Sequence, residues 1–172
     1  VSGGLSYCSD LVAFIKENFP VFRIGVGGYP VKHPESSDAF SDLSHLKTKV
    51  DAGADFITTQ LFFENQVYFD FVKACNEVEI TVPILPGLLP VLSLGQVRRF
   101  CGMCEAVLPS ELEQQLTHAS EDEQPKVGSA WASAQVSELL NGGAPGYHIY
   151  ALNKPLSTLQ ILQSVGMNAK TS

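Results

Sequence analysis

The sequence lacks any segment suited to a bilayer, because no apolar run approaches the roughly 20 residues that cross one. It also lacks an excess of basic residues: 11 Lys and Arg stand against 18 Asp and Glu. The resulting net charge of −7 argues against a partner held through nucleic-acid phosphates. The first ten residues have neither the basic start nor the apolar stretch of a signal peptide. We therefore expect a cytoplasmic protein, with no nucleic acid and no membrane among its partners.

Cysteine is scarce, and the four present in 172 residues do not make a disulfide scaffold. Cys101 and Cys104 form a single CxxC, with no second pair and no nearby His, so we expect no metal site. Ser-His-Asp and G-x-S-x-G arrangements are absent as well. His118 and His148 have no partner in sequence, and we expect both to be structural.

What the sequence does contain is an alternation of short apolar runs with longer helical patterns. The short runs predict strands at residues 22–27, 56–60, 82–85 and 147–152. Helices are predicted at residues 5–19, 38–52, 64–77, 93–104, 109–117 and 123–141, the last ending at Gly142 and Gly143. This order predicts an α/β fold whose parallel strands are joined by right-handed crossovers.

Two architectures fit four such units, namely an open doubly wound sheet and part of a barrel. A nucleotide-binding open sheet usually has GxGxxG after its first strand. Here the segment GVGGYP places Pro30 where a helix should begin. A (β/α)8 TIM barrel is the better interpretation. Since a full barrel needs about 250 residues, this chain would be a fragment, roughly half, with about four β/α units.

In either architecture ligands bind at the carboxyl ends of the strands. Tyr29 and His33 follow the first predicted strand, in a loop whose glycines let a flat ligand approach the backbone. Gln60 ends the second, where a neutral amide could read the edge of a heterocycle. A Gln bonded to its own loop is the structural alternative. The loop at residues 87–90 and Lys154 complete this set.

Two predicted helices carry further candidates. Asp42, His45 and Lys49 form a polar face beside an apolar stripe of Leu43, Leu46 and Val50. A carboxylate there could bind ribose hydroxyls and an ammonium a diphosphate, although a solvated face explains the same pattern. In helix 93–104, Gln96 and Phe100 are four residues apart, so they could present an amide and a ring to one ligand.

Five segments, taken in order, resemble the second half of methylenetetrahydrofolate reductases: YCSDLV, GGYPVKHPE, DLSHLKTKVDAGADFITTQLFF, PILPGLLPV and HIYALNK. The resemblance implies a (β/α)8 barrel that holds FAD without a covalent bond. Its expected reaction passes a hydride from NADH or NADPH through the flavin to 5,10-methylenetetrahydrofolate, giving 5-methyltetrahydrofolate. Residues 1–167 would be a partial catalytic barrel and residues 168–172 a tail or linker.

The resemblance also implies roles for particular residues. His45 and Thr48 depart from the family, which more often has Asn or another polar residue and then Arg or Lys. Lys154 stands where the family usually has Arg; it keeps the charge but loses the bidentate fork that would hold the glutamate tail of folate. The implied cofactor-binding residues are Tyr7, Tyr29, His33, Asp42, His45 and Lys49, and the implied substrate-binding residues are Gln60, Gln96, Phe100 and Lys154.

No catalytic residue is expected within this chain, because the general-acid Glu and a flavin-proximal Asp would lie upstream. We expect the isolated chain to be an open barrel with exposed strand edges, unstable and inactive. The full-length protein is expected to be a homo-oligomer. Two alternatives remain: a proline-dehydrogenase-like flavin barrel, and a catalytically inactive fragment acting as a folate-binding or subunit-interaction module.

Overall fold

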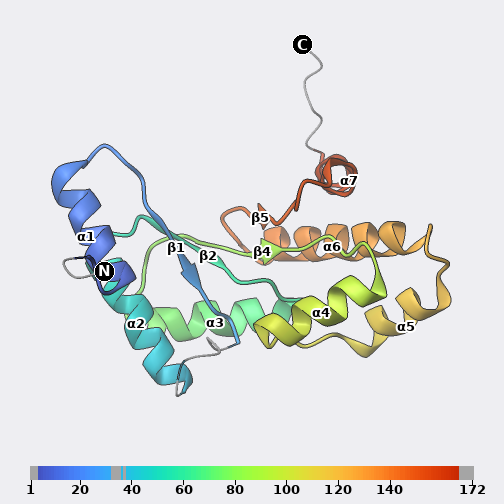
Figure 1. The fold of residues 1–172 in the computed structure, drawn as a ribbon, viewed down its shortest axis with the longest axis horizontal. Coiled ribbons are helices and arrows are strands. Elements are labelled where there is room, and N and C mark those ends of the chain that lie inside the picture. Colours follow the sequence, from blue (N-terminus) through green and yellow to red (C-terminus); the bar gives the residue numbers. More distant parts are fainter. Residues whose placement is uncertain (1–3, 32–35, 37, 167–172) are drawn as a thin grey trace, which may run out of the picture.

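A computed structural model describes residues 4–31, 36 and 38–166 of the chain. Helices and strands alternate along most of it (Figure 1). The elements in order are α1 (Cys8–Asn18), β1 (Gly25–Gly28), α2 (Ala39–Asp51), β2 (Phe56–Thr59), α3 (Asn65–Glu77), β3 (Ile84–Leu85), β4 (Gly87–Leu88), α4 (Leu94–Cys104), α5 (Ser110–His118), α6 (Gln124–Asn141), β5 (His148–Ile149) and α7 (Pro155–Ser164).

All of these strands pair in parallel. β1, β2 and β3 form one ladder, in which Gly28 is opposite Thr59 and Thr58 is opposite Leu85. β4 and β5 form a second ladder. Only Pro86 separates β3 from β4, so one extended stretch pairs first with β2 and then with β5. A proline has no N–H to donate to a ladder, which fits a change of partner at this residue. The predicted α/β fold with a parallel sheet is confirmed.

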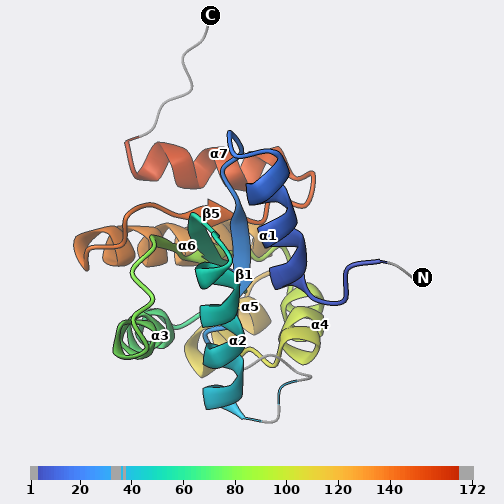
Figure 2. The same ribbon diagram turned by 90° about the vertical axis from the view of Figure 1, so that its left-hand side faces the viewer.

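Helices cover the strands from several sides, as the view in Figure 2 shows. The larger apolar core includes residues of β1, β2 and β3 and of the helices packed against them. Ile57, Phe62 and Cys75 are among its buried members. The predicted stripe of α2 belongs to it, with Leu46 buried and Leu43 and Val50 packed alongside. A second apolar cluster joins the residues after β2 to α4 and α5. Within the described ranges, no helix combines the length and apolar character needed to cross a membrane.

Several predicted boundaries are wrong. The first strand begins at Gly25 rather than residue 22, because the Ile24 N–H and carbonyl bond to Asp55 instead of continuing a ladder. The last strand is His148–Ile149 rather than residues 147–152, since Leu152 and Asn153 have φ of 47° and 59° and turn the chain.

The segment predicted as a loop at residues 87–90 begins instead as a strand, because Gly87–Leu88 is β4. Helix α7 was not predicted. It begins with Pro155, a residue favoured at the first helical position. The predicted helix end at residues 142–143 is confirmed, with Gly143 at a φ of 93°.

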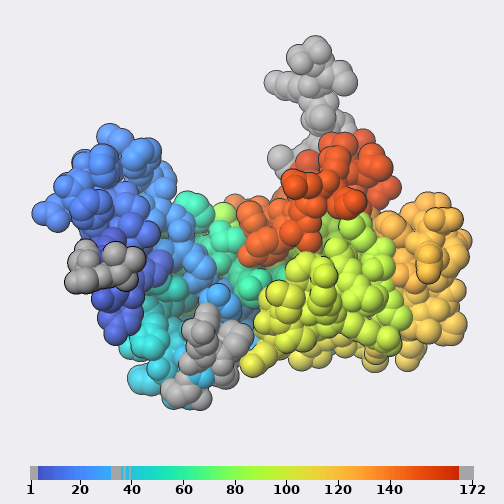
Figure 3. Space-filling view, viewed as in Figure 1, coloured from blue at the N-terminus to red at the C-terminus, as the bar shows by residue number. Residues whose placement is uncertain are grey.

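The molecule has an apolar surface at its N-terminal end, the blue end of Figure 3. On α1 and the turn after it, Phe14, Phe19 and Phe22 are 48%, 50% and 58% exposed. Leu156 of α7 is 75% exposed. Among the described residues, no strand pairs with the outer edge of β1 or of β5. The outer edges of β1 and β5 are therefore unpaired within the described part of the chain.

Candidate functional site

The carboxyl ends of β1 and β2 lie side by side and carry two of the predicted site residues. Tyr29 directly follows β1 and Gln60 directly follows β2, because Gly28 and Thr59 are register partners. Both line one shallow depression, together with Pro30, Val31, Leu61 and Cys104. It is an open surface hollow that encloses no space for a water molecule, so it is not a preformed small-molecule site, which typically has roughly 300 Å³ or more.

One end of the Gln60 side-chain amide is hydrogen-bonded within its own loop. Its Oε1 accepts a hydrogen bond from the Leu61 N–H at 2.9 Å. This is the structural alternative for the amide oxygen. In the described part of the chain no acceptor binds Nε2, so a donor remains for a ligand beside the depression.

Gln96 and Phe100 do not line the depression. Gln96 Oε1 accepts from the Leu92 N–H at 2.8 Å, near the start of α4. Phe100 packs against the second apolar cluster, and the Arg99 guanidinium lies 5.4 Å from its ring centroid. Leu61 and Cys104 belong to or border the same cluster, so α4 supports the depression from one side.

Sequence reasoning missed the hydrogen bonds that hold Thr59, the residue before Gln60. Thr59 is fully buried; its Oγ1 accepts from the Gly87 N–H at 2.8 Å, and its carbonyl accepts from the Tyr150 hydroxyl at 2.9 Å. Burial, then the neighbouring Tyr29 and Cys104, raise the pKa of Tyr150. Tyr150 therefore stays a neutral donor near the depression. Only the β4–β5 register brings it there, which no local sequence pattern reveals.

Two of the predicted cofactor residues, Lys49 and Asp42, lie near the outer edge of β1. The Lys49 ammonium donates to the Gly27 carbonyl at 2.7 Å. Burial lowers the pKa of Lys49, while the nearby Cys8 and Asp42 act in the opposite direction. The Gly28 carbonyl accepts from the N–H of Gln60, directly after β2. Because successive strand carbonyls point to opposite sides, the Gly27 carbonyl faces the open edge.

The remaining predicted residues are more scattered. Tyr7 precedes α1 and is 73% exposed, with its N–H bonded to Asp10 Oδ2 at 2.9 Å. His45 is exposed on α2, and Lys154 is exposed where α7 begins. His33 lies outside the described residues. Neither Tyr7, His45 nor Lys154 lines the depression.

A larger hollow of about 410 Å³ lies among the helices. Starts of α3 and α5 and the middle of α6 form its walls, and Glu64, Glu111, Glu138 and Trp131 are among the lining residues. None of the site residues predicted from the sequence is among those lining this hollow. We place the candidate site at the smaller depression, because in parallel α/β folds the carboxyl ends of strands position ligands.

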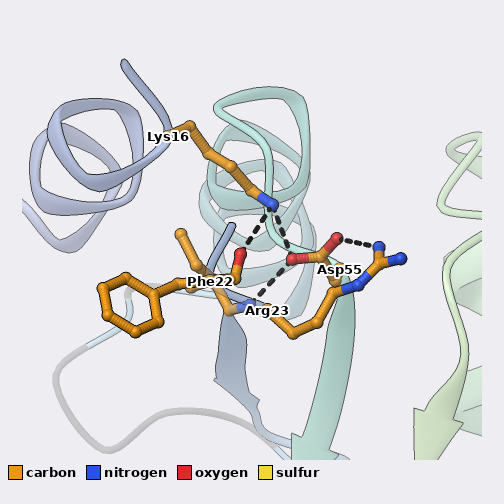
Figure 4. Close-up of polar contacts among 5 residues, drawn as sticks. Lys16, Phe22, Arg23 and Asp55 are labelled. Carbon is orange, nitrogen blue, oxygen red and sulfur yellow. Dashed lines mark hydrogen bonds and ion pairs between the residues drawn. The ribbon is translucent and has the colours of Figure 1, made fainter. Parts of the chain in front are cut away.

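At the amino ends of β1 and β2, ion pairs and hydrogen bonds converge on Asp55 (Figure 4). Asp55, directly before β2, accepts from Lys16 Nζ at 2.7 Å, Arg23 Nη1 at 2.8 Å and the Ile24 N–H at 2.7 Å. The Lys16 bond foremost, then those of Ile24 and Arg23, hold the pKa of Asp55 far below its usual value. This network ties α1 to both strands.

Comparison with known proteins gives a consistent result. A model of the family described as methylenetetrahydrofolate reductase matches residues 1–166. A probable methylenetetrahydrofolate reductase (NADPH) of Caenorhabditis elegans is 36% identical over 162 residues, which are 92% of this chain and 24% of the relative. The 5,10-methylenetetrahydrofolate reductase of Escherichia coli K12 is 36% identical over 163 residues, 94% of this chain and 55% of the relative.

A plant relative and a solved structure extend this result. Methylenetetrahydrofolate reductase (NADH) 1 of Arabidopsis thaliana is 36% identical over 179 residues, 97% of this chain and 30% of the relative. The chain thus spans from a quarter to just over half of these relatives. An uncharacterized Clostridium thermocellum protein that binds two copies of 5-methyl-5,6,7,8-tetrahydrofolic acid matches with a TM-score of 0.59 and 16% identity, over 95% of this chain and 63% of that one. It shares the fold.

Proposed function

Because this chain belongs to the methylenetetrahydrofolate reductase family, we propose that it supplies one half of a flavin-dependent reductase. The substrate is 5,10-methylenetetrahydrofolate, the product is 5-methyltetrahydrofolate, and the electrons come from NADH or NADPH. The observation that carries the proposal is the pairing of Tyr29 and Gln60 around one depression at the carboxyl ends of β1 and β2. An aromatic ring and an amide donor are what a flat heterocycle needs for stacking and for edge recognition.

In this proposal Gln60 binds the pterin. Its Nε2 has no acceptor within the described residues, so it can donate to a ring nitrogen or carbonyl. Gln96 and Phe100 act from α4 as the supporting wall, and Lys154 attracts the glutamate carboxylates at the rim. The pterin and the nicotinamide use the same depression in turn. The first product must then leave before the second substrate binds, which gives ping-pong kinetics.

The residues along β1 fit FAD. A Cβ built on Gly27 would meet no atom within 4 Å, so the exposed backbone there can be approached by a flat or elongated group. Lys49 supplies an ammonium beside it, and Asp42 lies near that ammonium. We assign Tyr7, Tyr29, His33, Asp42, His45 and Lys49 to holding the cofactor. The chemistry expected from bound FAD is hydride transfer between the reduced nicotinamide and the folate.

The proposed fold is half of a (β/α)8 barrel, with residues 1–167 as the partial domain. The open edges of β1 and β5 and the exposed phenylalanines near α1 support further β/α units packing there. No Asp or Glu is among the described residues lining the depression. We therefore assign the proton donor for opening the imidazolidine ring to those further units.

The test uses the full-length protein that contains this chain. We expect a yellow preparation with a flavin absorbance band, which oxidises NADH or NADPH only when methylenetetrahydrofolate or another electron acceptor is added. Initial rates at several fixed concentrations of each substrate should give parallel double-reciprocal lines. A colourless protein that binds neither FAD nor 5-methyltetrahydrofolate would overturn the proposal.

A non-catalytic folate-binding or subunit-interaction module is the second candidate. The lack of a carboxylate among the described residues that line the depression favours this reading. The two candidates differ in one outcome. Binding of 5-methyltetrahydrofolate without turnover in the full-length protein would select the module, whereas turnover would exclude it.

A further inference from the structure

The peptide group between Thr59 and Gln60 is held on both sides. Its N–H, which belongs to Gln60, donates to the Gly28 carbonyl at 2.7 Å. Its C=O, which belongs to Thr59, accepts from the Tyr150 hydroxyl at 2.9 Å. These two bonds fix the plane of the peptide from which the Gln60 side chain starts, and the bond from the Leu61 N–H to Oε1 then orients the amide at its end.

The second of these bonds replaces one that the sheet does not make. The β2–β3 ladder ends at the pair of Thr58 and Leu85. Pro86 faces β5, where its carbonyl accepts from the His148 N–H, so Gly87 is the next residue that faces Thr59. The following N–H, that of Gly87, goes to the Thr59 hydroxyl rather than to its carbonyl. Without Tyr150 the carbonyl of this fully buried residue would have no donor among the described residues.

Gly87 makes this approach sterically possible. A Cβ at this position would overlap the Thr59 carbonyl oxygen and come within 2.9 Å of the Tyr150 ring. His148 packs edge-on against the same ring, with centroids 4.8 Å apart. The ring is therefore held between β4 and the start of β5, and its hydroxyl reaches across to β2.

We propose that Tyr150 is a positioning residue for folate binding, acting through the Thr59–Gln60 peptide on the amide of Gln60. This inference rests on the proposed function, because it takes Gln60 as the pterin-binding residue. Tyr150 does not line the depression itself. Loss of its hydroxyl leaves the Thr59 carbonyl buried without a donor, and the peptide then reorients to find one.

The experiment compares Tyr150→Phe with Tyr68→Phe in the full-length protein. Tyr68 is the control: it is buried whereas Tyr150 is partly buried, and its hydroxyl likewise donates to a strand carbonyl, that of Ile84, at 2.8 Å. Phe keeps the ring in both variants. We expect Tyr150→Phe to weaken 5-methyltetrahydrofolate binding about tenfold, with kcat and flavin content within about twofold of the parent. Tyr68→Phe should leave this affinity unchanged.

A double-mutant cycle shows whether the effect passes through Gln60. In a Gln60→Ala background, Tyr150→Phe should change folate affinity less than about twofold, because the amide it orients is gone. An equal loss in both backgrounds would mean that Tyr150 acts directly on the ligand and would overturn the inference. So would a Tyr150→Phe variant that matches Tyr68→Phe in folate affinity.

Two further results separate this inference from the proposed function. A parent protein that does not bind 5-methyltetrahydrofolate, or a Gln60→Ala variant with full affinity, overturns the proposed function itself. Should Tyr150→Phe fail to fold, 3-fluorotyrosine at position 150 keeps the ring and offers a stronger donor. It should preserve or tighten folate binding, and a weaker affinity there would overturn the inference.

Discussion

The two ends of β2 are fixed in chemically different ways, although only four residues separate Asp55 from Gln60. At the amino end, one carboxylate receives two cationic donors and a backbone N–H. At the carboxyl end, neutral bonds from Tyr150 and to Gly28 hold a single peptide. At the amino end the Asp55 carboxylate accepts all three of these bonds. At the carboxyl end, Gln60 Nε2 has no acceptor within the described residues. In parallel α/β barrels stability belongs to the first end and ligands to the second.

The largest effect should follow from removing the charge at the amino end. Asp55→Asn keeps the shape but weakens the bonds to Lys16 and Arg23, and we expect the Tm to fall by on the order of 5 °C. Asp51→Asn is the control, since it removes an exposed carboxylate paired with Lys47 on α2 and should shift the Tm by about 1 °C or less. Scanning calorimetry of the full-length variants measures both. Equal shifts would mean that the Asp55 network is no more than a surface ion pair.

At the carboxyl end the expectation is reversed, with binding lost and stability kept. Gln60→Ala removes the free donor and should weaken 5-methyltetrahydrofolate binding at least about tenfold, with the Tm within about 2 °C of the parent. Gln66→Ala, an exposed glutamine bonded to Asp70 on α3, should change neither quantity. A large drop in Tm for Gln60→Ala would show that this end also carries the fold.

Acid should separate the two ends without any mutation of the binding site. Because the pKa of Asp55 is depressed in the folded protein, its contribution to stability is fully present above the ordinary carboxyl value of 3.8. It is lost as the pH falls from there toward the lower folded value. Denaturant midpoints of the parent and Asp55→Asn should therefore differ by a constant amount above the ordinary carboxyl value of 3.8 and converge as the pH falls below it. A difference that stays constant or grows below this value would contradict the sign.

The smallest effect concerns the rim, at the start of α7. Lys154→Arg restores a bidentate fork and should tighten binding of a folate with its glutamate tail about threefold. A tail-less pterin provides the control, because its affinity should not change. Isothermal titration with both ligands gives the comparison, and equal affinities for the two variants would remove Lys154 from the binding site.

A structural feature of this molecule can be predicted from the sequence when it depends on residues that are close together in the chain. The stripe of Leu43, Leu46 and Val50 is local, and it packs as its spacing predicts. The closeness of Tyr29 and Gln60 also follows from a general rule, since parallel strands bring their carboxyl ends together. Their roles, and those of the other predicted site residues, stay predictions.

The features that were missed depend on contacts between distant segments. The Tyr150–Thr59 bond spans 91 residues, and the Asp55 network joins residues 32 and 39 positions apart. No periodicity within a helix or strand records such a pairing. Helix α7 was missed for a different reason: it buries Ser157 and Ile161 while Leu156 and Leu159 stay exposed, so its apolar pattern does not match its burial.

The bond from Lys49 to the Gly27 carbonyl gives one ammonium two competing uses. Gly27 offers that carbonyl on the outer edge of β1, where a neighbouring strand would claim it with a backbone N–H. Docking of such a strand would release the lysine, and a diphosphate could then take up its charge. In the function proposed above Lys49 holds the cofactor, so covering this edge would free its ammonium for that role, and the two binding events would strengthen each other by the same factor.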